Sequence, residues 1–353
     1  MKIFKEAYRI FLLIVAFALT VFVFFYDVVA ASRADGWTVL FGILGFLLSS
    51  CLAVVFHEAG HLLFGICFGM RPVRVQIGPF VFDRNKKGVA LRNFEPFGSC
   101  DFYPVRTDRL SLRYAMTVAG GLIFSLAFVL LSALFYLRGG AMHYVFGMGL
   151  PVSVFLFFYN AAPLSLPSGD TDGRLLADIL AKTPETIVTL HVLAIQGGLL
   201  SRSPASLSED LYFDVPVVAE DERGFIALTR LRYLYFLDKG DRAGALAQSM
   251  RLRELLVYLS EGDLEEIYSQ LLYDCCALER NEDGAAALFD RQEEYLLSQK
   301  SATAYRILAA YHATYGEKER AEEYVRSARS ALANEPLAGI AKMEEKLLNE
   351  TNA

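Results

Sequence analysis

The stretch "VVFHEAGHLLFG", residues 54–65, decides how this chain folds and what chemistry it carries. It sets His57, Glu58 and His61 among large apolar side chains. On a helix, positions i and i+4 lie on one face about one turn apart, so both imidazoles can bind one metal ion. The spacing H-E-x-x-H is typical of zinc sites in which the glutamate is the general base. Two chance core histidines are the alternative, but ionisable groups within an apolar span are costly and usually functional.

The composition predicts a membrane-embedded part followed by a soluble part. Hydrophobic residues make up 54% of the chain, and the excess lies before about residue 165. The net charge of -6 argues against nucleic acid binding. Five cysteines without a C-x-x-C pair favour reduced thiols in a cytoplasm over a disulfide framework.

Four apolar stretches are candidates for membrane spans, because a helix needs about 20 apolar residues to cross a bilayer. They are residues 10–30, 37–70, 115–137 and 144–159. The second is long enough to tilt or protrude, and the fourth is marginal. A cleaved signal peptide is the alternative for the first, although its apolar core is longer than usual.

Basic residues predict the orientation of these spans. Lysines and arginines gather before the first stretch and between the second and third. Cytoplasmic loops carry this excess, so we expect a multi-pass cell-membrane protein with its N-terminus and its C-terminal part in the cytoplasm. Between residues 71 and 94, "VRVQIGPFVF" and "VALRNF" flank the polar turn "DRNKKG". This pattern predicts a short β-hairpin, and a loop on the membrane surface is the alternative.

A catalytic zinc ion needs a third protein ligand and an open position. The fourth stretch ends in "FYNAAPLSLPSGDTDGRLL", residues 158–176, where Asn160, Asp170 and Asp172 are the nearest polar groups. Irregular backbone at this depth is tolerated only beside protein or a watery cavity, which an active site would provide. Alternatively, Asp172 simply caps the helix that follows.

Together, four motifs resemble the site-2 protease family of intramembrane zinc metallopeptidases over roughly residues 35–180. They are "HEAGH" at 57–61, "PFGSC" at 96–100, "AGGLIFSLAFVLL" at 119–131 and the separated pair "NAAP" and "DGRLL". The resemblance implies a zinc ion held by His57, His61 and Asp172, with Glu58 as the base. It also implies that Asn160 lines the substrate cleft, and that a peptide bond in or near a substrate's transmembrane helix is hydrolysed.

The chain departs from the family pattern in three respects. The interval from Asn160 to the Asp-Gly pair is longer than usual, which makes Asp170 a rival to Asp172 as ligand. Ser125 stands where many members have asparagine. No segment resembles a PDZ domain, so regulation by such a domain is not expected.

The rest of the chain reads as helices. Residues 175–200 form helices at the membrane domain or a fifth span, and "SRSPASLSEDLYFDVP", residues 201–216, looks like a linker. The stretch "AYRILAAYHATYGEKERAEEYVRSARSALANEP", residues 304–336, resembles a tetratricopeptide repeat, with fainter copies before it. Such a domain would bind a cytoplasmic protein partner, although a plain helical domain without a ligand is the alternative.

We therefore expect a mainly α fold with about four spans, a small hairpin between the second and third, and a soluble helical-repeat domain. The expected domains are residues 1–36 (first span), 37–174 (metalloprotease core), 175–219 (connecting helices and linker) and 220–353 (repeat domain). The expected function is intramembrane zinc proteolysis of transmembrane protein substrates in the lipid bilayer. The alternative is an inactive membrane scaffold that acts through its repeat domain.

Overall fold

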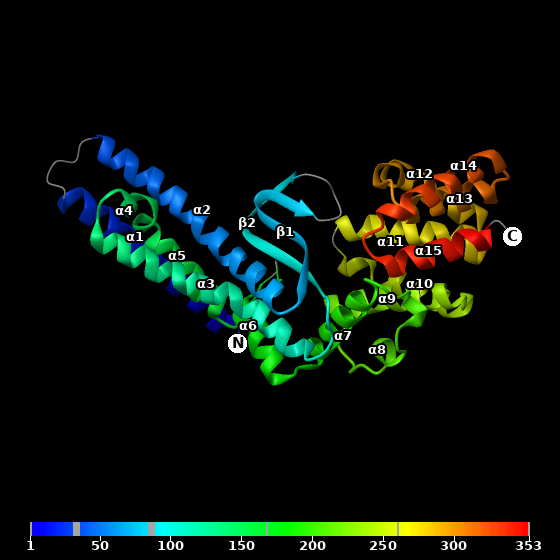
Figure 1. Cartoon of the computed structure of the whole chain (residues 1–353), viewed down its shortest axis with the longest axis horizontal. Helices are drawn as coiled ribbons and strands as arrows, with labels where there is room; N and C mark the ends of the chain where they lie inside the picture. Colours follow the sequence, from blue (N-terminus) through cyan, green and yellow to red (C-terminus); the bar gives the residue numbers. More distant parts are fainter. Residues whose placement is uncertain (1, 31–35, 84–88, 167–168, 260, 352–353) are drawn as a thin grey trace. The chain divides into compact units, whose positions relative to one another are not determined.

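The structure, a computed structural model, describes residues 2–30, 36–83, 89–166, 169–259 and 261–351. These residues are mainly helical, as predicted (Figure 1). The chain divides into two compact units, Met1–Thr183 and Pro184–Ala353, which are described separately. The region predicted to connect two domains, residues 175–219, is thus divided between the units rather than forming one of its own.

The first unit consists of long apolar helices and a pair of strands. Helices suit this composition because every backbone N–H and C=O is bonded within the segment, as lipid requires. Its helices are α1 (Lys2–Ala30), α2 (Gly36–Cys67), α3 (Leu110–Arg138), α4 (Ala141–Val145), the 3₁₀ turn η1 (Gly147–Gly149), α5 (Leu150–Ala161) and α6 (Asp172–Ala181).

Three helical segments in the described residues are long and apolar enough to cross a membrane: Val39–Cys67, Leu110–Arg138 and Ala141–Ala161. The last is broken by η1 between α4 and α5, so the predicted fourth span at 144–159 is not one simple helix. Helix α1 has 29 residues, but its described apolar part, Ile10–Val23, is shorter than a span. These three segments are consistent with a membrane protein, and the number of crossings stays a prediction.

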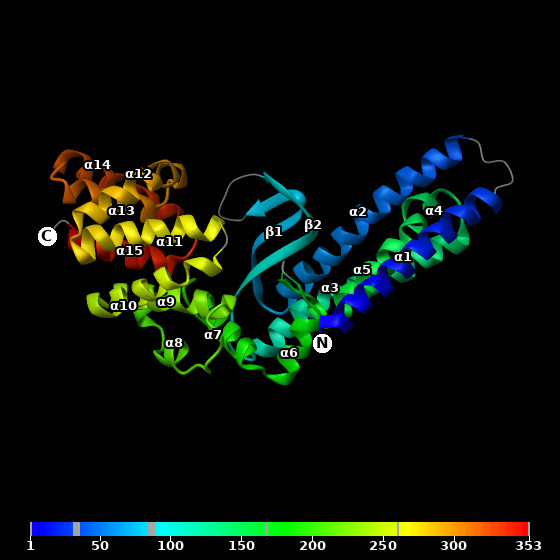
Figure 2. The same ribbon diagram turned by 180° about the vertical axis from the view of Figure 1, so that it is seen from behind.

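Helices α2 and α3 lie side by side in close contact (Figures 1 and 2). A Cβ atom on Gly60 would lie 2.3 Å from the carbonyl oxygen of Gly120, and one on Gly120 would lie 2.4 Å from that of Gly60. Only two facing glycines permit this approach of the backbones. Ala53, Phe128 and Leu156 form a buried cluster between α2, α3 and α5.

The predicted β-hairpin is confirmed and is longer than expected. Strands β1 (Met70–Asp83) and β2 (Val89–Pro104) pair antiparallel, from Met70 opposite Pro104 to Phe82 opposite Val89, with shifts in register. The motif "PFGSC", expected after the hairpin, is therefore part of β2. Residues 84–88 of the predicted turn lie outside the described residues. Both strands contact α2, beside its C-terminal end (Figure 2).

The second unit contains consecutive helical hairpins. They pair α9 (Arg223–Lys239) with α10 (Arg242–Glu254), α11 (Glu261–Tyr273) with α12 (Glu282–Gln299), and α13 (Ala302–Thr314) with α14 (Lys318–Ala331), followed by α15 (Ala338–Thr351). The side chains of Asp241 and Asn281 cap α10 and α12, which explains why these helices begin there. Between α11 and α12, the π-helical segment Asp274–Glu279 holds the buried Cys275 and Cys276.

Residues 201–216, predicted to be a linker, are packed instead. They contain the 3₁₀ turn η2 (Pro204–Ser206) and α8 (Asp210–Phe213). The Tyr212 side chain is fully buried, and its hydroxyl donates to the Pro204 carbonyl at 3.0 Å. The preceding α7 (Pro184–Gly198) has 15 residues and packs against α9, so no fifth span is found among the described residues.

Candidate metal centre

Helix α2 presents His57 and His61 one turn apart, with their Nε2 atoms 3.2 Å from each other. The Nδ1 atom of each ring has its own partner on α3. The Nδ1 of His57 lies 2.8 Å from the Ser125 hydroxyl, and the Nδ1 of His61 lies 3.0 Å from the Thr117 carbonyl. A carbonyl only accepts, so His61 donates from Nδ1 and keeps a lone pair on Nε2. Both rings can thus offer Nε2 to a metal ion, while the contact at Nδ1 fixes the orientation of each ring.

Asp172 completes the group from the start of α6. The N-cap of α6 is Thr171, whose hydroxyl accepts from the Arg174 N–H. Asp172 is therefore not the capping residue, which was the alternative to a ligand. The Asp172 carboxylate faces the histidines instead. Its Oδ2 lies 3.4 Å from Nε2 of both His57 and His61, and it is buried without a hydrogen-bond partner. A buried carboxylate oxygen without a hydrogen-bond partner is expected to bind a cation.

The spacing of these three atoms suits a tetrahedral ion. They lie 3.2, 3.4 and 3.4 Å apart. A tetrahedral site with bonds of about 2.0–2.1 Å has ligand atoms about 3.3–3.4 Å apart. Within the described residues, the potential metal-binding group is His57, His61 and Asp172. Asp170, the predicted rival, lies on the exposed end of the short strand pair β3 (Ser165–Leu166) and β4 (Gly169–Asp170), outside this group.

Gly121 makes room for the imidazoles. A Cβ atom there would lie 2.3 Å from Nε2 of His61 and 2.9 Å from Cε1 of His57. The two glycines of "AGGLIF" thus have different tasks, since Gly120 lets the helices approach and Gly121 admits the metal ligands.

The group opens into a cavity of about 650 Å³. Glu58 lines this cavity beside the histidines, although its side chain is only 3% exposed. Asn160, predicted to line a substrate cleft, also faces the cavity, as does Asp170. The structure therefore gathers every predicted site residue around one space.

The cavity is also lined by polar residues that the sequence did not single out, among them Cys100, Tyr114 and Thr171. The Cys100 sulfur lies 3.2 Å from Oε2 of Glu58. The signal for Cys100 was its place in "PFGSC", but the sequence alone gave no reason to set that motif against α2. Nothing in the sequence marked Tyr114.

No family model matches this chain, and neither a curated protein nor a solved structure matches it significantly.

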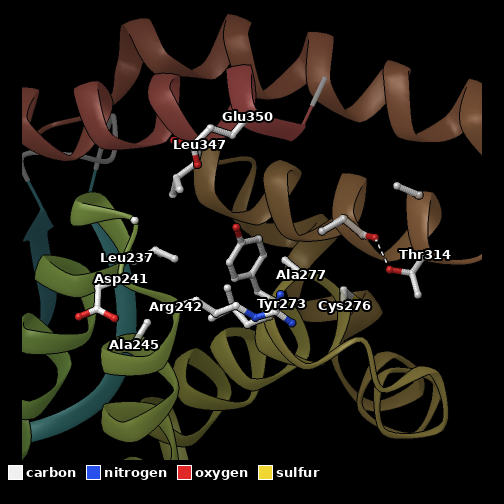
Figure 3. A pocket seen from close by; sticks show the side chains of 14 residues that line it. Leu237, Asp241, Arg242, Ala245, Tyr273, Cys276, Ala277, Thr314, Leu347 and Glu350 are labelled. Carbon is white, nitrogen blue, oxygen red and sulfur yellow. Dashed lines mark hydrogen bonds between the residues drawn. The ribbon is translucent and has the colours of Figure 1, made fainter. Parts of the chain in front are cut away.

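A second cavity, of about 410 Å³, lies within the helical hairpins of the second unit. It is lined by Leu237, the turn Gly240–Asp241, the π-helical segment and the ends of α13 and α15. Figure 3 shows the Tyr273 ring standing among these side chains, with Ala245 and Ala277 nearby. The guanidinium of Arg306 lies over the same ring at 4.0 Å.

Proposed function

We propose that this protein is an intramembrane zinc metalloprotease of the site-2 protease type, which hydrolyses peptide bonds within or near transmembrane segments of membrane proteins. The observation that carries the proposal is the convergence of two Nε2 atoms and one carboxylate oxygen beside Glu58, on a helix apolar enough to span a membrane. Two imidazoles and one carboxylate, with space for a further ligand, are the donor set of catalytic zinc. Calcium and magnesium prefer oxygen ligands alone.

In this proposal, His57, His61 and Asp172 would hold the zinc ion, which would supply Lewis acidity toward water and the scissile carbonyl. Glu58 takes a proton from the attacking water and passes it to the leaving amine. Asn160 lines the cavity, where its amide N–H groups can donate to the oxygen of the scissile carbonyl.

The proposal is tested on the purified full-length chain and in cells. We expect about one zinc ion per chain, lost when His57 or Asp172 is replaced by alanine. Glu58→Gln should keep the zinc ion and abolish cleavage, because it removes only the base. Comparative membrane proteomics of cells with the wild type or Glu58→Gln should find a precursor that accumulates in the variant.

The second candidate function is a membrane scaffold without activity that binds a protein partner through the helical hairpins. The cavity beside Tyr273 favours it (Figure 3). The same comparison decides between the two, since identical fragments from wild type and Glu58→Gln would support the scaffold. Under the protease proposal, this cavity is where a cytoplasmic partner would bind.

A further inference from the structure

Strand β2 presses directly on the side chain of Glu58. A Cβ atom on Gly98 would lie 2.4 to 2.5 Å from Cγ, Cδ and Oε1 of Glu58, closer than real contacts allow. The backbone of β2 therefore touches the carboxyl group, and glycine is the residue that leaves room for it. Both residues line the cavity of the metal group.

Two residues further along β2, Cys100 faces the same side chain. Gly98 lies where the register of β1 and β2 shifts, and both it and Cys100 contact the Glu58 side chain. The Cys100 sulfur lies 3.2 Å from Oε2 of Glu58 and 3.8 Å from its main-chain oxygen. A carboxylate only accepts, so the thiol is the donor in this contact.

We propose that Gly98 and Cys100 are positioning residues for Glu58. The thiol engages Oε2, and the backbone at Gly98, which lies against Oε1, limits rotation of the carboxyl group. This inference rests on the proposed role of Glu58 as the base. It adds that the β-hairpin, far from Glu58 in sequence, sets the direction in which the base points. Val75 of β1 pairs with Cys100, so β1 is connected to Glu58 through this residue of β2.

The kinetic test compares Cys100→Ala and Cys100→Ser in the full-length chain, with the precursor identified by the Glu58→Gln comparison as substrate. Partners of this kind are typically worth about 10- to 100-fold. We expect kcat to fall by about that factor in Cys100→Ala, with KM and zinc content unchanged. Cys100→Ser should recover most of kcat, because a hydroxyl also donates. Cys67→Ala is the matched control, since Cys67 is an exposed cysteine on α2.

A spectroscopic test needs no substrate. The S–H stretch of Cys100, assigned by its loss in Cys100→Ser, should move to higher frequency in Glu58→Gln, because an amide oxygen is a weaker acceptor than a carboxylate. An unmoved band would overturn the inference.

The inference and the proposed function fail in different ways. Cleavage by Cys100→Ala at the wild-type kcat, or a serine variant as slow as alanine with zinc retained, would overturn the positioning role and leave the protease standing. Equal fragments from wild type and Glu58→Gln would overturn both.

Discussion

Helix α3 has two buried serines, of which one contacts a histidine of the metal group and the other does not. Ser125 contacts Nδ1 of His57 at 2.8 Å, whereas the Ser132 hydroxyl, two turns along, is buried without a hydrogen-bond partner in the described residues. A histidine ligand depends on the partner of its other nitrogen for orientation.

We therefore expect Ser125→Ala to weaken zinc binding by about 10- to 100-fold. The hydroxyl then no longer fixes the His57 ring, while the ligand atoms themselves remain. Competition with a chromophoric chelator measures the affinity in purified protein. Ser132→Ala is the matched control and should bind zinc like the wild type. Equal affinities for all three proteins would show that Ser125 does not orient His57.

In the second unit, Asp274 is a buried carboxylate that lowers stability at neutral pH. It is fully buried and accepts hydrogen bonds from the Tyr233 and Ser249 hydroxyls. Burial raises the pKa of Asp274 from 3.8 to about 6, because desolvation outweighs the two hydrogen bonds. A raised pKa means that the folded state prefers the protonated form. The free energy of unfolding therefore falls as pH rises from about 4 to about 6, and no further above that.

Asp274→Asn keeps the shape and removes this dependence. We expect the variant to be more stable than the wild type by about 1–3 kcal/mol at pH 7.5. The gain should shrink as pH falls to 5. Protection of the buried Cys275 and Cys276 against thiol labelling during heating reports unfolding of this unit in the full chain. Asp283→Asn, at an exposed acid on α12, is the control. A gain that is constant from pH 5 to 7.5 would contradict the assignment.

At the scale of elements, the protease proposal predicts that an unwound substrate binds at the hairpin. A helix in lipid hides its scissile carbonyls in its own hydrogen bonds, so it must unwind locally before attack. An extended segment can then add as a strand to a sheet edge. Strand β1 is suited to this because it is long, pairs with β2 on one side, and lies against the C-terminal half of α2.

Proline at Val75 or Ile77 should therefore slow cleavage by about 3- to 10-fold. Proline has no N–H group, so one backbone hydrogen bond to the substrate is lost. The initial rate on the identified precursor is the measurement, with zinc content as the check on folding. Val75→Ala and Ile77→Ala keep the N–H and should cleave nearly as fast as the wild type. Proline variants with unchanged rates would exclude strand addition at β1.

The elements that the sequence predicted best are those with local signals. The apolar helix around His57 and the alternation of β1 are periodic patterns, and both elements form. What the sequence missed depends on long-range contacts. Cys100 meets Glu58 across 42 residues and Ser125 meets His57 across 68, and neither spacing leaves a local pattern. The sequence pattern also could not tell a capping Asp172 from a capping Thr171, and the structure places the cap of α6 at Thr171.

At the scale of the whole molecule, the arrangement of helices in the first unit bears on the number of membrane crossings. Helix α1 packs against α5, and the Tyr8 hydroxyl donates to the Phe158 carbonyl at 3.2 Å. The start of α1 therefore lies beside the end of α5. In the same way, the end of α2 lies beside the start of α3, where His61 meets the Thr117 carbonyl. Helices α1 and α5 thus run in opposite directions, as do α2 and α3.

If α1 crosses the bilayer with the other three segments, the crossings are even in number and both ends of the chain lie on one side. The basic residues before α1 and between α2 and α3 predict that this side is the cytoplasm. Fusions of a reporter that is active only in the cytoplasm, placed at the N-terminus and at the C-terminus, should both be active. The same reporter inserted between Gly139 and Gly140, in the connection from α3 to α4, should be silent. An active C-terminal fusion with a silent N-terminal one would mean that α1 does not cross. The segments Val39–Cys67, Leu110–Arg138 and Ala141–Ala161 would then be the crossings, and the metal group on α2 would keep its place relative to the cytoplasm.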